Sequence, residues 1–269
     1  PMLQTGPDMD MVEALVNNDA SVKGIWCVPK YSNPTGNSYS EETVKRFAAL
    51  KPAAVDFRIY WDNAYAVHHL YEDKQDSLPE ILSECAAAGN PDMVYEFAST
   101  SKISLPGSGV AVMASSVGNI ADIKKSMTVQ TIGHDKVNQL RHVRFFKNTE
   151  GIAVHMKKHA DILRPKFEIV DTVLREEIGE LGIGTWTKPN GGYFVSFDSM
   201  PGCAKDIFNA AKKAGVTLTN AGAAFPYGID PEDKNIRIAP SYPSDGEMKK
   251  AMQVFTLCVK LVSAEHLLH

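Results

Sequence analysis

A lysine surrounded by hydroxyl-bearing residues and glycines is the first candidate for chemistry in this chain. Lys102 follows Ser99-Thr100-Ser101 and precedes Pro106-Gly107-Ser108-Gly109. Hydroxyls, an ammonium group and the accessible backbone N–H groups of a glycine-rich turn are typical of a loop that holds a phosphate. The pattern therefore indicates a phosphate cradle around Lys102.

Two other short motifs combine residue types that bind ligands. Trp61-Asp62-Asn63-Ala64-Tyr65 places a carboxylate and a phenol three residues apart. Asn33-Pro34-Thr35-Gly36 is a turn signal that begins with an amide. Each also has an ordinary interpretation, as a cap with a packed aromatic in the first case and as a turn in the second. Their shared position, each directly after a predicted strand, favours a function.

The elements that would position these motifs alternate between strands and helices. Short apolar runs predict buried strands at 24–28, 57–61, 93–98 and 110–115. Capping residues and a glycine stop predict helices at 40–50 and 77–89. Strands separated by helices indicate an α/β fold with a mainly parallel sheet, and such sheets bind ligands at the carboxyl ends of their strands. We therefore expect the three motifs at one edge of the sheet.

The rest of the chain has a different organisation. Residues 119–182 are helical in pattern, with one long helix expected over 149–181 that is broken or kinked near Pro165. Short strands are expected at 185–187, 193–197, 216–219 and 235–239, and helices at 204–214 and 245–261. The sequence thus predicts a first domain over 1–160, a joining helix that begins near 149, and a smaller C-terminal α+β domain over 161–269.

Composition and charge argue against several classes of protein. There are 28 Lys and Arg against 32 Asp and Glu, for a net charge of −4, whereas a nucleic-acid binder is expected to carry a basic excess. No uninterrupted apolar run approaches the roughly 18 residues that cross a bilayer. The acidic start is unlike a signal peptide, and the absence of an initial Met suggests a truncated or processed N-terminus. We expect neither a nucleic-acid nor a membrane partner.

The cysteines and histidines give no sign of a metal site. Four widely spaced cysteines are expected to be reduced, buried thiols of a cytoplasmic protein: Cys27, Cys85, Cys203 and Cys258. His155 and His159 have the spacing of metal ligands on a helix, but lysines lie between them and a solvated helix face is expected. His68-His69 follows a strand and is expected to pack rather than to line a site.

Taken together, the motifs resemble the fold-type I, pyridoxal-phosphate-dependent aminotransferases of the aspartate aminotransferase superfamily. Residues 28–36 and 101–109 carry a narrower resemblance to a bacterial aspartate-aminotransferase-like branch related to the MocR regulators. The likeness covers essentially the whole chain. It implies a large cofactor-binding domain with a mainly parallel sheet, partial here, a smaller C-terminal α+β domain, and a homodimer.

The resemblance also implies a role for each motif residue. Lys102 would form the internal aldimine with pyridoxal 5'-phosphate and later move the proton at the substrate α-carbon. Asp62 would keep the pyridine nitrogen protonated. Asn33 and Tyr65 would hydrogen-bond the phenolic oxygen of the cofactor, and Ala64 would pack under its ring. The Asn33–Pro34 bond is expected to be cis on the same ground.

The phosphate would be held by Ser99, Ser101 and the backbone near Gly109, with Gly107 permitting close approach. Many relatives have an arginine seven or eight residues after the lysine, where this chain has Gly109 and Val110. The resemblance therefore places part of the phosphate binding elsewhere. Family members normally have a long segment before the position that matches the first residue of this chain. We therefore expect this chain to be a fragment or the product of a truncated gene.

Arg237 is a single arginine in the apolar run 235–239. It could extend to the surface, but the matched position favours a guanidinium that receives the substrate α-carboxylate. The Gly-Gly-aromatic run 189–194 resembles the strand on the substrate side. Arg141 and Arg144 are candidate partners for a side-chain carboxylate, although charges on a helix surface are the stronger expectation.

Three functions follow from these observations. The first is an aminotransferase that moves an amino group from an amino acid, with aspartate expected, to a 2-oxo acid, with 2-oxoglutarate expected. The second is a β-lyase or decarboxylase that uses the same cofactor and residues. The third is a non-catalytic, MocR-like domain that binds an effector. Whichever of these functions the whole protein has, this chain by itself is a candidate for an inactive fragment.

Overall fold

The computed structural model describes residues 1–269, which divide into two compact units. The first unit comprises 1–30, 37–67 and 76–157, and the second comprises 31–36, 68–75 and 158–269. The turn 31–36 thus belongs with the C-terminal part of the chain, although the strand before it belongs to the first unit.

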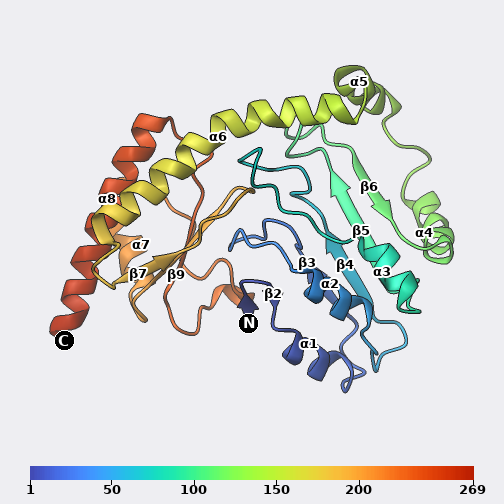
Figure 1. Ribbon diagram of the computed structural model, residues 1–269, viewed down its shortest axis with the longest axis horizontal. Helices are drawn as coiled ribbons and strands as arrows, with labels where there is room; N and C mark the ends of the chain where they lie inside the picture. The colour runs from blue at the N-terminus through green and yellow to red at the C-terminus, as the bar shows by residue number, and fades with distance from the viewer. The chain divides into compact units, whose positions relative to one another are not determined.

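A four-stranded sheet forms the centre of the first unit (Figure 1). Its strands lie in the order β3 (Gly24–Cys27), β4 (Arg58–Asp62), β5 (Val94–Ser99) and β6 (Ala111–Ala114). The first three are parallel and β6 is antiparallel to β5. This is the mainly parallel sheet that the sequence predicts.

The two faces of this sheet have different surroundings. One face packs on α2 (Glu41–Ala48) and α3 (Ile81–Ala87) around the buried side chains of Phe47, Ile59 and Trp61. On the other face Trp26 is 63% exposed and stacks on Tyr60 and Phe97, at centroid distances of 5.6 and 6.2 Å. The prediction of a buried first strand is therefore wrong for Trp26, because period-two alternation turns it away from the helices.

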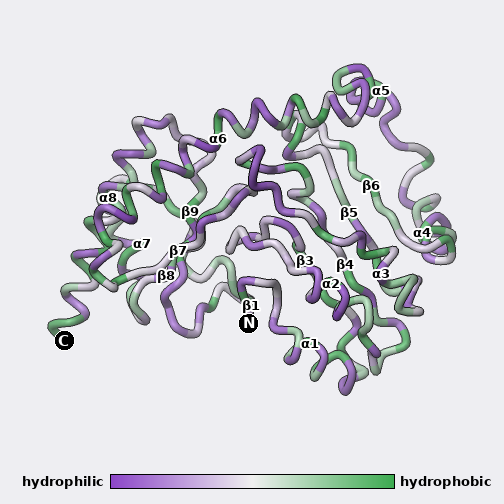
Figure 2. The backbone as a smooth tube through the Cα atoms, viewed as in Figure 1, coloured by the Kyte–Doolittle hydropathy of each residue, from purple (hydrophilic) through white to green (hydrophobic).

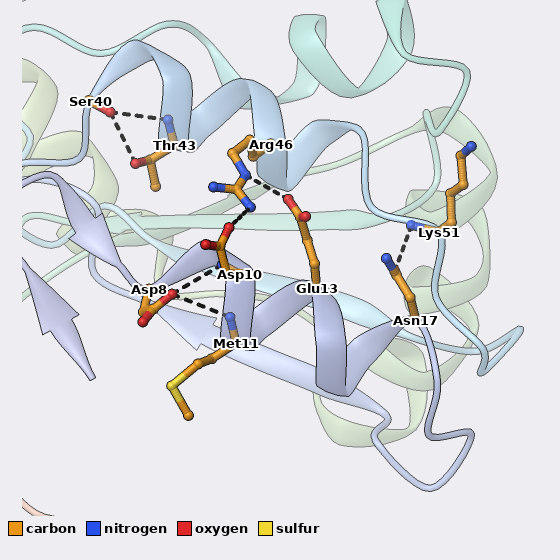
Figure 3. Close-up of polar contacts among 9 residues, drawn as sticks. All are labelled: Asp8, Asp10, Met11, Glu13, Asn17, Ser40, Thr43, Arg46 and Lys51. Atoms are coloured by element: carbon orange, nitrogen blue, oxygen red, sulfur yellow. Dashed lines mark hydrogen bonds and ion pairs between the residues drawn. The ribbon is translucent and has the colours of Figure 1, made fainter.

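The chain begins with elements that the sequence does not predict. A short antiparallel pair, β1 (Met2–Leu3) and β2 (Gly6–Pro7), precedes α1 (Met9–Val16). Arg46 joins α2 to α1 through Asp10 and Glu13, at 2.6 and 2.7 Å (Figure 3). The Ser40 hydroxyl caps α2 by accepting the N–H of Thr43.

Three helices follow the sheet, as the pattern predicts: α4 (Val117–Gln130), α5 (Lys136–Phe146) and α6 (Thr149–Ile178). The sequence predicts a break or a kink near Pro165, and the break is absent because α6 continues through this residue. A proline removes one backbone hydrogen bond. The C-terminal half of α6 buries Phe167, Val170 and Leu174 in the core of the second unit.

The second unit contains an antiparallel sheet of β7 (Gly184–Trp186), β8 (Val195–Ser199) and β9 (Asn235–Ile238), together with α7 (Ala204–Lys213), the short 3₁₀ helix η1 (Pro226–Gly228) and α8 (Asp245–Leu268). The strand predicted at 216–219 is absent, because these residues form no ladder with β9; they line a cavity with Arg237 and Ile238. The last helix is longer than the predicted 245–261.

Helix α8 is long and apolar enough, by length and composition, to be a candidate membrane span. A search for uninterrupted apolar runs in the sequence does not identify this helix, because polar residues divide its apolar residues. Figure 2 shows hydrophilic and hydrophobic residues interspersed along α8. Its apolar side buries Met252, Phe255 and Val259 in the core of the second unit, and a core helix passes the same test of length and composition.

Candidate functional site

Two predicted site residues end neighbouring strands of the first unit. Asp62 is the last residue of β4 and Ser99 is the last residue of β5. Asp62 pairs in register with Phe97, so Ser99, two residues further, points to the same face. A carboxylate and a hydroxyl therefore share one face at the carboxyl edge of the parallel strands, as predicted.

The Asp62 carboxylate lies beside the exposed aromatic stack. Trp26 Nε1 donates a hydrogen bond of 3.3 Å to Asp62 Oδ2. Asp62 is half-buried, and it forms no ion pair within this chain. The carboxylate oxygen Oδ1 accepts no hydrogen bond in this chain. Trp26 is not among the site residues predicted from the sequence, although the alternation of side chains along strands indicates that it shares a face with Asp62.

Lys102 lies close to Tyr65, a second predicted site residue. The Lys102 Nζ is 5.2 Å from the centroid of the Tyr65 ring, in cation–π geometry. Tyr65 is buried at 4% exposure, whereas Lys102 is exposed. The structure thus brings an amine at the end of β5 next to the phenol that follows β4.

The loop after Lys102 is tightly packed on itself. The N–H of Ser101 donates to Ser99 Oγ at 3.2 Å. A Cβ on Gly109 would lie 2.2 Å from Ser101 Oγ, so only glycine fits there, while Gly107 has a φ of +79° that favours glycine at a turn. Both serines and Gly109 are consequently neighbours. Ala64 is half-buried in the turn that follows Asp62.

A small cavity of about 180 Å³ lies in the first unit behind this edge, lined in part by Lys30, Asn63 and Glu96. Burial raises the pKa of the Glu96 carboxyl, and burial lowers the pKa of the Lys30 ammonium group. Asn63 Nδ2 donates to Glu96 Oε1 at 3.3 Å. This bond ties the residue after Asp62 to the neighbouring strand.

In the second unit, Arg237 contacts the predicted cofactor ligand Asn33. Arg237 NH1 donates a 3.0 Å hydrogen bond to Asn33 Oδ1, and NH2 is 3.4 Å from Thr219 Oγ1. The guanidinium carbon lies 4.5 Å from the centroid of the Phe194 ring. Arg237 forms no ion pair in this chain, and its buried Nε has no hydrogen-bond partner. The guanidinium therefore keeps donors for an external anion.

Glycines allow the segment 189–194 to lie against the turn that carries Asn33. A Cβ on Gly191 would lie 2.3 Å from Cε2 of Tyr31, and one on Gly36 would lie 2.5 Å from Pro189. The Asn33–Pro34 bond is cis, as the resemblance implies. Gly192, the second glycine of the run, has a φ of +81°, and a Cβ there would lie 2.9 Å from Cβ of Tyr31, so both glycines of the run lie against Tyr31.

Other candidate residues have plainer positions. His68 is buried and packs near Tyr193, with ring centroids 5.5 Å apart, in agreement with the expected packing role. His155 is half-buried and its Nε2 lies 2.8 Å from the Ile103 carbonyl oxygen, so the prediction of a solvated face is wrong for it. Arg141 and Arg144 are exposed on α5, and all four cysteines are buried and free.

Similarity to known proteins was found along the whole chain. It is 46% identical over 269 residues to an aspartate aminotransferase of Corynebacterium glutamicum, covering 99% of this chain and 61% of that protein. The crystal structure of an aspartate transaminase from the same species matches with a TM-score of 0.96 at 46% identity, covering 99% of this chain and 62% of that one. The chain thus spans less than two thirds of the length of these relatives.

A more distant structure shares the fold. An α-aminoadipate aminotransferase of Thermus thermophilus, complexed with N-(5'-phosphopyridoxyl)-L-leucine, matches with a TM-score of 0.81 at 20% identity over 98% of this chain and 65% of its own. The predicted α/β fold of the type I transferases is thereby confirmed. A family model described as aspartate amino-transferase matches residues 1–269, and the chain belongs to that family.

Proposed function

We propose that this chain forms the part of a pyridoxal-phosphate-dependent aminotransferase that attaches the cofactor and binds the substrate carboxylate. The observation that carries the proposal is the grouping at the sheet edge. Asp62 ends β4, Ser99 ends β5, and the Lys102 Nζ lies 5.2 Å from the Tyr65 ring. These groups follow separate strands, and together they suit the ring, the aldehyde and the phosphate of one pyridoxal phosphate molecule.

The residues fit this cofactor by their chemistry. A carboxylate without an ion-pair partner suits a protonated pyridine nitrogen, and an exposed amine suits attachment to an aldehyde. Hydroxyls and a loop closed around Gly109 suit a phosphate. Pyridoxal phosphate would supply the electron-withdrawing ring that stabilises negative charge at the substrate α-carbon.

Each side chain then has a specific task. Asp62 would hold the ring nitrogen through its negative charge, and Trp26 fixes the orientation of that carboxylate. The Lys102 amine would move the proton from the substrate α-carbon to the cofactor. Tyr65 and Asn33 would hydrogen-bond the phenolic oxygen, and the small Ala64 side chain would leave room for the ring.

Phosphate binding is assigned to Ser99, Ser101 and the backbone at Gly109. Because Gly109 and Val110 occupy the positions where many relatives have an arginine, these groups supply hydrogen bonds without a neighbouring guanidinium. Groups outside this loop therefore balance the rest of the negative charge of the phosphate.

Arg237 receives the α-carboxylate of the amino acid. Its free donors and the absence of an ion pair in the chain support this role, as does the stacking on Phe194 that fixes the plane of the guanidinium. For the substrate pair we propose aspartate and 2-oxoglutarate, on the basis of the 46% identical relative named an aspartate aminotransferase. We further propose a homodimer in the cytoplasm, a location that suits four buried free thiols.

Product analysis tests this function. The purified protein, supplied with pyridoxal phosphate, is incubated with aspartate, with 2-oxoglutarate and with both. We expect oxaloacetate and glutamate to form in equal amounts, and in excess over the enzyme, only when both acids are present. Lys102→Ala should abolish turnover, and Lys124→Ala, which removes an exposed lysine of α4, should not.

Other products would contradict the assignment. Ammonia or carbon dioxide released from aspartate without a second acid would show a lyase or decarboxylase. Turnover that survives Lys102→Ala would exclude the proposed role of this amine.

A further inference from the structure

The loop that carries Lys102 depends on Thr100 for its shape. The N–H of Thr100 donates to the Val110 carbonyl at 2.9 Å, and the N–H of Val110 donates back to Thr100 Oγ1 at 2.9 Å. The N–H groups of Ile103 and Ser104 both donate to the Thr100 carbonyl, at 2.9 and 2.8 Å. Thr100 therefore closes the base of the loop and organises the turn around Lys102.

One histidine of α5 contacts this loop on both sides of Lys102. His142 Nε2 lies 2.9 Å from Thr100 Oγ1 and 2.8 Å from Ser104 Oγ. His142 Nδ1 lies 2.9 Å from the Asn138 carbonyl oxygen. Because a carbonyl can only accept, Nδ1 carries a proton and Nε2 is the atom that faces the two hydroxyls. The orientation of the imidazole is thereby fixed.

Two further side chains attach the same loop to the helices. Asn138 Nδ2 donates to the Ser108 carbonyl at 2.8 Å. His155 Nε2, from α6, donates to the Ile103 carbonyl at 2.8 Å, and its ring packs 5.2 Å from that of Phe145. The backbone after Lys102 is thus held by α5 and α6, while the lysine side chain itself is exposed.

We propose that His142 is a positioning residue for the Lys102 amine. It acts through Thr100 and Ser104, whose hydroxyls it binds, and has no contact with the reacting atoms. By holding both residues it limits the conformations of the loop, so that the amine needs less ordering when it reacts. This inference rests on the proposed function, because it assumes that the Lys102 amine is the group that reacts.

Two substitutions separate the polar contacts of His142 from its packing. His142→Phe keeps a ring beside Phe146, 6.0 Å away, and removes both nitrogen atoms. His142→Gln keeps a polar atom near the place of Nε2. The matched control is His134→Phe, at an exposed position before α5. Thr100→Val removes the shared hydroxyl and provides the same test if His142→Phe does not fold.

The first measurement needs no cofactor. Amide hydrogen exchange at Ser104 and Val110 is followed in each variant, and the rate of covalent attachment of pyridoxal phosphate to Lys102 is measured separately. Loss of His142's hydrogen bonds should accelerate exchange by about tenfold and slow attachment by about tenfold in His142→Phe. His142→Gln should restore part of both, and His134→Phe should change neither.

Unchanged exchange and attachment in His142→Phe, or equal losses in the Phe and Gln variants, would overturn the role of His142. If the wild-type protein forms no bond with the cofactor at Lys102, the proposed function itself is contradicted, and the positioning role with it. The two failures are distinguished because the exchange rates are measured on the protein without cofactor.

Discussion

Arg237 and Asn33 are 204 residues apart in the sequence and are joined by a 3.0 Å hydrogen bond from NH1 to Oδ1. The amide oxygen accepts from the guanidinium, so the amide nitrogen of Asn33 remains a donor for another group. This bond couples the residue proposed to bind a substrate carboxylate to the one proposed to bind the cofactor. The stack on Phe194 at 4.5 Å holds the same guanidinium from a second direction.

The fork of Arg237 should be needed as well as its charge. Arg237→Lys keeps the charge but loses the paired donors, and we expect kcat/KM for the amino acid to fall at least about tenfold; Arg237→Ala should lose on the order of 100-fold. Steady-state kinetics with varied amino acid measure this. Arg175→Lys, at an exposed position of α6, is the control. A change confined to kcat, with KM unaltered, would contradict a role in binding the carboxylate.

The indole N–H of Trp26 should contribute to cofactor binding by fixing Asp62. Trp26→Phe keeps an aromatic ring for stacking on Tyr60 and removes the 3.3 Å hydrogen bond. We expect cofactor affinity to weaken about two- to tenfold, the range for one hydrogen bond. Titration followed by absorbance measures it. Trp186→Phe is the matched control, since Trp186 Nε1 donates to Asp171 Oδ1 at 2.9 Å in the second unit. Equal losses in both variants would contradict a specific effect on Asp62.

Asp230 should stabilise the turn before β9, which carries Arg237. Its carboxylate is 6% exposed and accepts the N–H groups of Glu232, Lys234 and Asn235, at 3.1, 2.8 and 2.8 Å. Burial alone would raise the pKa of Asp230, but these three hydrogen bonds outweigh it and lower the pKa. Asp230→Asn should reduce the free energy of unfolding by about 1–3 kcal/mol, because the amide cannot satisfy all three donors.

The pH dependence of this contribution has a definite sign. The folded protein holds the proton of Asp230 less tightly than the unfolded chain, whose pKa is near 3.9. The stabilisation is therefore present above about pH 4 and is lost as the pH falls through the lower pKa of the folded state. Denaturant unfolding between pH 3 and 7 measures it, with Asp206→Asn, at an exposed position of α7, as the control. The difference in free energy of unfolding between the wild type and Asp230→Asn should become smaller at low pH. A difference that stays constant with pH would contradict the assignment.

The strand ends and their polar residues follow from the sequence because both depend on local patterns. An apolar run that stops at Asp62, and another that stops before Ser99, fix where the strands end, and the parallel arrangement then brings the ends together. The apolar strand around Arg237 follows from a similar local pattern, whereas the role proposed for Arg237 comes from the resemblance to the family. Local patterns also indicate a glycine-rich turn after Ser101, although the steric need for Gly109 is visible only in the structure.

The remaining features depend on how distant elements dock. The contact of His142 with Thr100 joins residues 42 apart, and the contact of His155 with Ile103 joins residues 52 apart. No periodicity in α5 or α6 specifies such pairs. The error at 216–219 has the same origin, since β-branched residues favour a strand but a strand forms only where a neighbour pairs with it.

The most direct test of the account is the location of the cofactor bond. The protein is incubated with pyridoxal phosphate, reduced with borohydride, digested and analysed by peptide mass spectrometry. We expect the modified residue to be Lys102, and we expect Asp62→Asn, which removes the charge proposed to face the ring nitrogen, to lower cofactor affinity sharply. A label on another lysine, or no label above that of a Lys102→Arg variant, would contradict it.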